Sequence, residues 1–168
     1  MERWQAQGVG SSSEGPRQDG FRDRLGGQAL IVYLDTSGLV KLYVEEEGSA
    51  AARELVAAAA VVATSVLAYP EARSALARLH REGGLTDVEH VRAKAELDQD
   101  WAGFLALEVE GDWRRAGDLT ERHALRGADS VHLAAYLALI GRSRGAPVRF
   151  FCFDERLDRA ARVEAGEE

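Results

Sequence analysis

Short apolar runs alternate with longer amphipathic segments along the chain from Ala29 onward. An unbroken apolar run of a few residues is typical of a strand that is buried on both faces of a sheet. Strands separated by helices favour a parallel sheet with helices on both sides. We therefore expect a three-layer α/β/α domain with a central, mostly parallel sheet of four to five strands. The predicted strands cover residues 30–34, 61–65, 107–109 and 148–153.

Apolar residues at helical spacing predict the intervening helices. Thr86 and Glu89 form a capping-box pattern, which is typical of a helix start. Ser49 is a plausible N-cap for a helix that runs to about Ala59. The predicted apolar stripe of the helix after Thr86 consists of Val88, Val91, Ala95, Trp101 and Phe104. Other helices are expected near residues 70–82, 113–119, 128–140 and 155–163.

The first 28 residues differ in composition from the rest. They contain 6 of the 17 glycines, a run of three serines and few aliphatic residues. Such a segment cannot bury enough apolar area to offset its ordering entropy. We expect residues 1–28 to be a disordered extension and residues 29–168 to form one domain. The extension has no apolar core, so it is not expected to be a secretory signal.

The charge balance restricts the possible partners. With 21 basic and 28 acidic residues the formal net charge is −7, the wrong sign for binding nucleic acid by bulk charge. Any contact with nucleic acid must come from a local basic patch or from metal ions. The single cysteine, Cys152, excludes an internal disulfide and fits a cytoplasmic protein. No apolar run reaches the roughly 18 residues of a membrane span.

Four acidic residues fall at predicted positions on one edge of the sheet. Asp35 and Asp154 follow the first and last apolar runs, and Glu71 and Asp129 lie in first helical turns. Ligands bind at the carboxyl ends of strands in open parallel sheets. Converging carboxylates repel one another unless cations lie between them, and their oxygens suit Mg²⁺ or Mn²⁺. Helix capping and the helix dipole are the alternative explanation for each acid taken alone.

The residues around these acids resemble the four motifs of PIN-domain ribonucleases, in particular the VapC-type toxins of type II toxin–antitoxin modules. The matching segments are YLDTSGLVKLY (33–43), EARSALARL (71–79), LRGADSVHLA (125–134) and FFCFDERLDRAA (150–161). They occur in the order found in that family. The resemblance implies a PIN-like fold and a metal-dependent endoribonuclease.

The resemblance also implies roles for individual residues and partners. Asp35, Glu71, Asp129 and Asp154 would be the catalytic and metal-binding acids, with Asp35 and Asp129 as the core ligands of Mg²⁺ or Mn²⁺. Ser37 would support the site by hydrogen bonding. The implied partners are an RNA substrate, a VapB-like antitoxin that covers the acidic pocket, and a second copy in a homodimer.

Other chemically active side chains have simpler interpretations. His132 lies among aliphatic residues and is predicted to be packed and hydrogen-bonded. Cys152 is predicted to be a buried structural thiol. Arg73 and Arg126 are candidates for binding RNA phosphates, because a guanidinium pairs well with phosphate oxygens.

Two other classes of function compete with the nuclease. An aspartyl-phosphate protein, such as a phosphatase or receiver domain, also uses an Asp at a strand end. The phosphatase pattern has a second Asp two positions later, where this chain has Ser37. The third possibility is a PIN-like binding module without activity, against which the presence of all four acids argues.

Overall fold

A computed structural model describes residues 29–108, 113–143 and 145–166. The predicted extension, residues 1–28, lies outside the described residues. Four strands form one sheet: β1 (Ile31–Leu34), β2 (Val61–Ser65), β3 (Leu105–Leu107) and β4 (Val148–Phe151). Their order is β3-β2-β1-β4, and every neighbouring pair is parallel.

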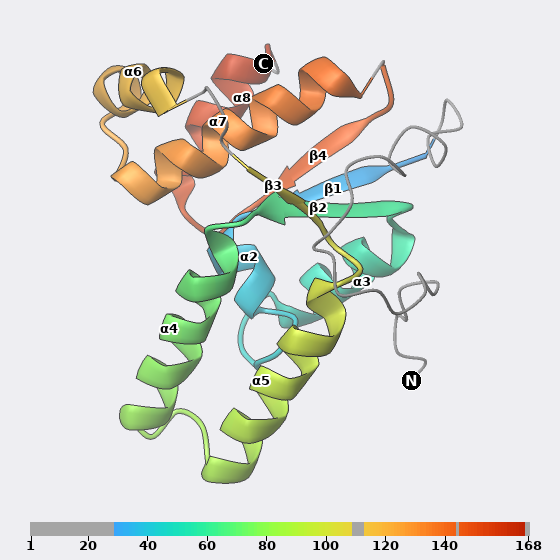
Figure 1. The fold of residues 1–168 in the computed structure, drawn as a ribbon, viewed down its shortest axis with the longest axis vertical. Coiled ribbons are helices and arrows are strands. Elements are labelled where there is room, and N and C mark those ends of the chain that lie inside the picture. Colours follow the sequence, from blue (N-terminus) through green and yellow to red (C-terminus); the bar gives the residue numbers. More distant parts are fainter. Residues whose placement is uncertain (1–28, 109–112, 144, 167–168) are drawn as a thin grey trace.

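Seven helices cover the two faces of the sheet, which confirms the three-layer α/β/α prediction for the described residues (Figure 1). One layer lies above the sheet in this view and the other below it. The upper layer contains α6 (Trp113–His123), α7 (Gly127–Arg142) and α8 (Glu155–Ala165); the lower one contains α2 (Thr36–Val40), α3 (Ser49–Ala58), α4 (Ala68–Arg81) and α5 (Asp87–Trp101).

Each helical layer packs on alternate residues of the central strand. Ile31 and Tyr33 belong to the core beneath α6, α7 and α8, whereas Val32 and Leu34 belong to the core on the opposite face. All four residues are fully buried. A strand buried on both faces needs apolar residues at every position, which explains the unbroken run in the sequence.

Several predicted boundaries differ from the observed ones, among them those of α3 and β3. In the structure, α3 begins at Ser49, and its N-cap is Gly48, which has a left-handed φ of 86°. The Ser49 hydroxyl instead donates to the Val44 carbonyl (2.8 Å) and stabilises the turn before the helix. The third strand covers Leu105–Leu107 rather than 107–109, and residue 109 lies outside the described residues.

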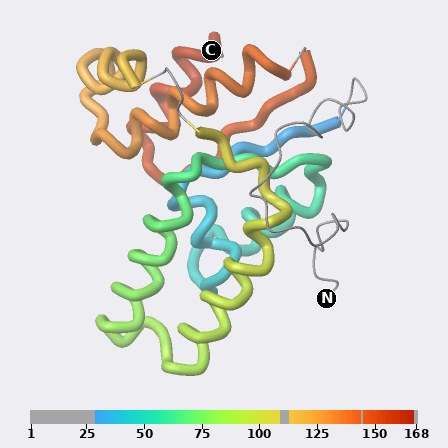
Figure 2. Tube along the Cα trace, in the orientation of Figure 1, coloured from blue at the N-terminus to red at the C-terminus, as the bar shows by residue number. Residues whose placement is uncertain are grey.

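The capping box of α5 is confirmed, and so is the packing of Trp101 and Phe104 against the core, but the rest of the predicted apolar stripe is wrong. Val88 and Val91 are 78% and 61% exposed, and the buried residues within the helix are Ala93 and Leu97. Helices α4 and α5 form a hairpin that extends away from the sheet (Figure 2). The first turns of α5 therefore lie too far from the sheet to bury a full apolar face.

The described residues contain no helix that is long and apolar enough to cross a membrane.

Candidate active site

Asp35 directly follows β1, as predicted, and caps the short helix α2. Its Oδ1 accepts a hydrogen bond from the Gly38 N–H (2.8 Å), and both carboxylate oxygens lie within 2.9 Å of the Ser37 hydroxyl. The residue is only 6% exposed. Burial raises the pKa of Asp35, although the Gly38 N–H, His132 and Ser37 act in the opposite direction. A carboxylate at the carboxyl end of the central strand is therefore held in one orientation.

Asp154 caps α8 at the same edge of the sheet. Strand β4 ends at Phe151, so Asp154 follows it by three residues rather than directly. Its Oδ1 accepts hydrogen bonds from the N–H groups of Arg156 (2.9 Å) and Leu157 (3.0 Å). Both acids that follow strands are therefore also helix caps, and the simple capping explanation holds for them alongside any chemical role.

Ser37 connects the loops that carry these two acids. Its hydroxyl donates to Asp35 and accepts a hydrogen bond from the backbone N–H of Phe153 (2.8 Å). Phe153 immediately precedes Asp154, so one hydroxyl joins the ends of β1 and β4. The supporting role predicted for Ser37 has this geometry as its basis.

Glu71 lies in the first turn of α4 and contacts His132 of α7. The His132 Nε2 is 3.2 Å from Glu71 Oε2, and its Nδ1 is 3.1 Å from the Tyr33 hydroxyl. The Thr36 hydroxyl also donates to Glu71 and lies 3.0 Å from His132 Nε2. A Tyr33 hydroxyl that donates to Nδ1 leaves the Nε2–H free to donate to the Glu71 carboxylate. The hydrogen bond from His132 lowers the pKa of Glu71.

Tyr33→Phe should lower the free energy of unfolding by about 1–3 kcal/mol, because it leaves the buried Nδ1 of His132 without its donor. Urea unfolding measures this change. Tyr69→Phe is the matched control, since its hydroxyl bonds to Asp98 at an exposed position. A Tyr33→Phe protein no less stable than the control would contradict the structural role of this bond.

Asp129, in the first turn of α7, lies near Asp154. Burial and then the charge of Asp154 raise the pKa of Asp129, whereas Arg126 and His132 act in the opposite direction. Both acids line a hollow of about 490 Å³ at the carboxyl edge of the sheet. The residues that line it are three acids, three arginines and one aromatic ring: Asp129, Asp154, Glu155, Arg126, Arg156, Arg159 and Phe153.

His132 interacts electrostatically with three of the four acids. It lowers the pKa of Asp35, Glu71 and Asp129, and Asp129 in turn interacts with Asp154. The structure thus brings the four predicted acids to one region from β1, α4, α7 and α8. The interpretation of His132 as packed and hydrogen-bonded is compatible with its position, since it is 2% exposed. Sequence reasoning missed its contact with Glu71.

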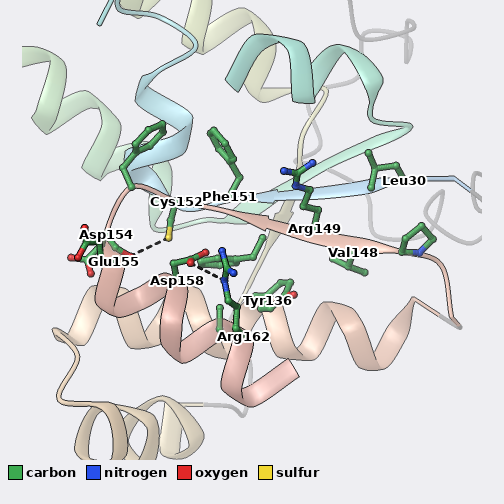
Figure 3. Close-up of a pocket in the computed structure, with 14 residues that line it drawn as sticks. Leu30, Tyr136, Val148, Arg149, Phe151, Cys152, Asp154, Glu155, Asp158 and Arg162 are labelled. Atoms are coloured by element: carbon green, nitrogen blue, oxygen red, sulfur yellow. Dashed lines mark hydrogen bonds and ion pairs between the residues drawn. The ribbon is translucent and has the colours of Figure 1, made fainter. Parts of the chain in front are cut away.

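A longer groove of about 850 Å³ runs beside β4 (Figure 3). Asp154 and Glu155 lie at one end of it, and Leu30 and Val148 lie toward the other. Cys152 faces this groove, where its thiol is 3.4 Å from the Asp154 carbonyl. Cys152 is half-buried and not fully buried as predicted. Its partial burial raises the pKa of the thiol, which stays protonated and is a poor nucleophile.

The two arginines proposed for RNA binding occupy different surroundings. Arg126 lies in the hollow beside Asp129. Arg73 pairs with Asp98 of α5 (3.0 Å) and donates to the Tyr69 hydroxyl (2.8 Å). RNA contact stays a prediction for both. Sequence reasoning missed Arg156 and Arg159, whose positions shortly after Asp154 on α8 were the available signal.

The chemistry of the four acids fits a hard divalent cation. Carboxylate oxygens are the ligands that Mg²⁺ and Mn²⁺ prefer, and a cation would offset the burial and repulsion that raise the pKa values of Asp35 and Asp129. Within the described residues, no group of three or more His, Cys, Asp and Glu side chains is arranged so that it could hold a metal ion. Asp35 and Asp154 direct carboxylate oxygens to helix N–H groups instead.

Comparison with known proteins identifies the family. The model of the PIN domain matches residues 32–163. The chain belongs to the PIN-domain family. Two similar relatives are the ribonucleases VapC45 and VapC49 of Mycobacterium tuberculosis strains, each 42% identical over 110 residues. These matches cover 65% of this chain and 76% of each relative, which makes the chain a VapC-type PIN domain.

Proposed function

We propose that this PIN domain is a divalent-metal-dependent endoribonuclease of the VapC toxin type. The observation that supports the proposal is that Asp35, Glu71 and Asp129 each interact with His132, while Asp154 interacts with Asp129 at the carboxyl edge of the sheet. The names of the two mycobacterial relatives support RNA as the substrate. The reaction is hydrolysis of a phosphodiester bond.

The proposed roles separate acids that would bind the cation from residues that orient those acids. Asp35 and Asp129 would be the core ligands of Mg²⁺ or Mn²⁺, with Glu71 and Asp154 completing the acidic set. Ser37 orients the carboxylate of Asp35, and His132 orients that of Glu71. When bound, the cation lowers the pKa of a water molecule and offsets the charge that develops on the phosphate.

The arginines explain how an acidic protein accepts RNA. The hollow at Asp129 contains Arg126, Arg156 and Arg159, although the whole chain has a net charge of −7. Guanidinium groups bind phosphate oxygens on either side of the bond to be cut. Three acids line the same hollow, so binding should depend on the positions of these three arginines more than on net charge.

Removal of divalent metal should abolish cleavage of RNA. Without a cation, the negative charge of the four carboxylates repels the negatively charged phosphate, and no metal-bound water is available for the reaction. The purified protein is dialysed against EDTA and tested with a labelled RNA by gel electrophoresis. Added Mn²⁺ or Mg²⁺ should restore the activity. Full cleavage in EDTA would contradict the metal-dependent mechanism.

The same preparation separates the nuclease from an inactive binding module. Calorimetry should detect Mn²⁺ binding to the EDTA-treated protein and a much weaker signal for Asp129→Asn. Metal binding without cleavage of any cellular RNA would favour the binding module. A phosphoryl adduct on Asp35 would favour the aspartyl-phosphate class.

We further propose a VapB-like antitoxin, a homodimer and a cytoplasmic location. The antitoxin would inhibit the enzyme by covering the acidic pocket. A small reading frame next to the gene, whose product copurifies with this chain and blocks cleavage, would support it. Light scattering of the isolated chain measures the number of copies, and a monomer at all concentrations would contradict the dimer.

A further inference from the structure

Phe153 exposes an aromatic ring beside the acidic site. It is 43% exposed, directly precedes Asp154, and lines both the hollow at Asp129 and the groove beside β4. Its backbone N–H donates to Ser37, the residue that orients Asp35. The position of the ring is therefore tied to the carboxylates on either side of it.

The surroundings of Phe153 hold its ring in place. The Phe151 ring packs against it edge-on, with centroids 5.3 Å apart, and the Lys41 ammonium lies 4.4 Å from its centroid. A Cβ at Gly48 would lie 2.3 Å from Cζ at the tip of the ring. Gly48 thus allows the ring tip to rest against the backbone. A ring fixed in this way while partly exposed is pre-organised for contact with a ligand.

Cationic side chains lie beside the same ring, together with the acids Asp129, Asp154 and Glu155. Arg126, Arg156 and Arg159 line the hollow that Phe153 borders, and Lys41 lies over the ring itself. Proteins bind unpaired nucleotides by combining exposed aromatic rings with nearby cationic side chains. The aromatic surface accepts a base and the cations accept the neighbouring phosphates.

We propose that Phe153 is a stacking platform for an unpaired base of the RNA substrate, next to the bond that is cut. This inference rests on the proposed ribonuclease function and adds a residue that positions an unpaired base beside the acidic site. The bases of a duplex are stacked on one another and are not available to the ring. Phe153 is a positioning residue, which acts by placing the phosphate near Asp35, Asp129 and Asp154.

The kinetic test replaces the ring and follows KM and kcat separately. Phe153→Leu should raise the KM for an unstructured single-stranded RNA about tenfold, the effect typical of losing one base–aromatic stack. Phe153→His should stay within about threefold of wild type at pH 8, because imidazole also stacks. Histidine is the suitable aromatic control, since Gly48 leaves no room for an added atom at the ring tip. Trp113→Leu, which removes an exposed ring from α6, should leave KM unchanged.

A binding test separates this inference from the ribonuclease assignment. Fluorescence anisotropy of a labelled single-stranded RNA is measured with Ca²⁺ in place of Mg²⁺, and the matching duplex is the comparison. We expect Phe153→Leu to weaken binding of the single strand about tenfold and of the duplex less than twofold. If Phe153→Leu lowers Tm, Phe153→Met is compared instead.

The outcomes are distinct. If wild type cleaves RNA and the Leu and Met variants match it in KM and binding, the stacking role is wrong and the ribonuclease stands. If wild type cleaves no RNA but only the non-aromatic variants lose single-strand binding, the stacking role stands and the ribonuclease assignment fails. An equal loss in Phe153→His and Phe153→Leu would overturn the stacking role.

Discussion

Asp35→Asn should lower RNA cleavage by at least about a hundredfold while the fold survives. The asparagine side chain keeps an oxygen that can accept the Gly38 N–H, so the N-cap of α2 is preserved. The substitution removes one negative charge from a residue that is 6% exposed. A cation that needs this charge would bind weakly, and the reaction would lose its activated water.

The measurement compares kcat/KM on the same labelled RNA with the free energy of unfolding in urea. Asp118→Asn is the matched control, because that acid lies exposed on α6. We expect the control to cleave RNA normally. A folded Asp35→Asn protein with wild-type activity would remove Asp35 from the mechanism and with it the proposed site.

Gly38→Ala should destabilise the protein by about 2–3 kcal/mol, because the added methyl group has no space. A Cβ at this position would lie 2.7 Å from the Phe151 carbonyl oxygen and 3.0 Å from the Phe151 ring. The same carbonyl accepts the Asp35 N–H (3.3 Å), so a shift of α2 would also move Asp35, the proposed catalytic acid. Activity should therefore fall together with stability.

Gly141→Ala provides the opposite result in the same kind of element. Nothing lies within 4 Å of a Cβ at Gly141, which is exposed on α7. Alanine there should raise the free energy of unfolding by about 0.5–1 kcal/mol, because it favours the helix. Equal unfolding energies for the two variants would show that the space at Gly38 is not limiting.

The layered fold could be predicted from the sequence because the central strand is apolar at every position. Leu30 to Leu34 has no charged residue, and the hydroxyl of Tyr33 is its one polar side-chain group, so both faces of that strand are expected to be buried. The buried face of α5 could not be predicted in this way. Val88 and Val91 have the right spacing for a buried stripe, but the α4–α5 hairpin carries them beyond the sheet.

The candidate site could be predicted only in part. Asp35 directly follows a strand, and that position by itself assigns it to the carboxyl edge. The contacts of Glu71 with Thr36 and His132 join residues far apart in the chain, and no local pattern reports them. Phe153 also went unnoticed, because an aromatic residue at the end of a strand is ordinarily part of the core. Its exposure follows from the turn between β4 and α8.

The four acids are contributed in sequence order by elements from both helical layers. Asp35 and Glu71 belong to the first half of the chain, whereas Asp129 lies in the first turn of α7 and Asp154 is the N-cap of α8. During synthesis, most of the chain is therefore made before all four acids are present. The proposed active site would therefore stay incomplete until α8 has been synthesised and has packed.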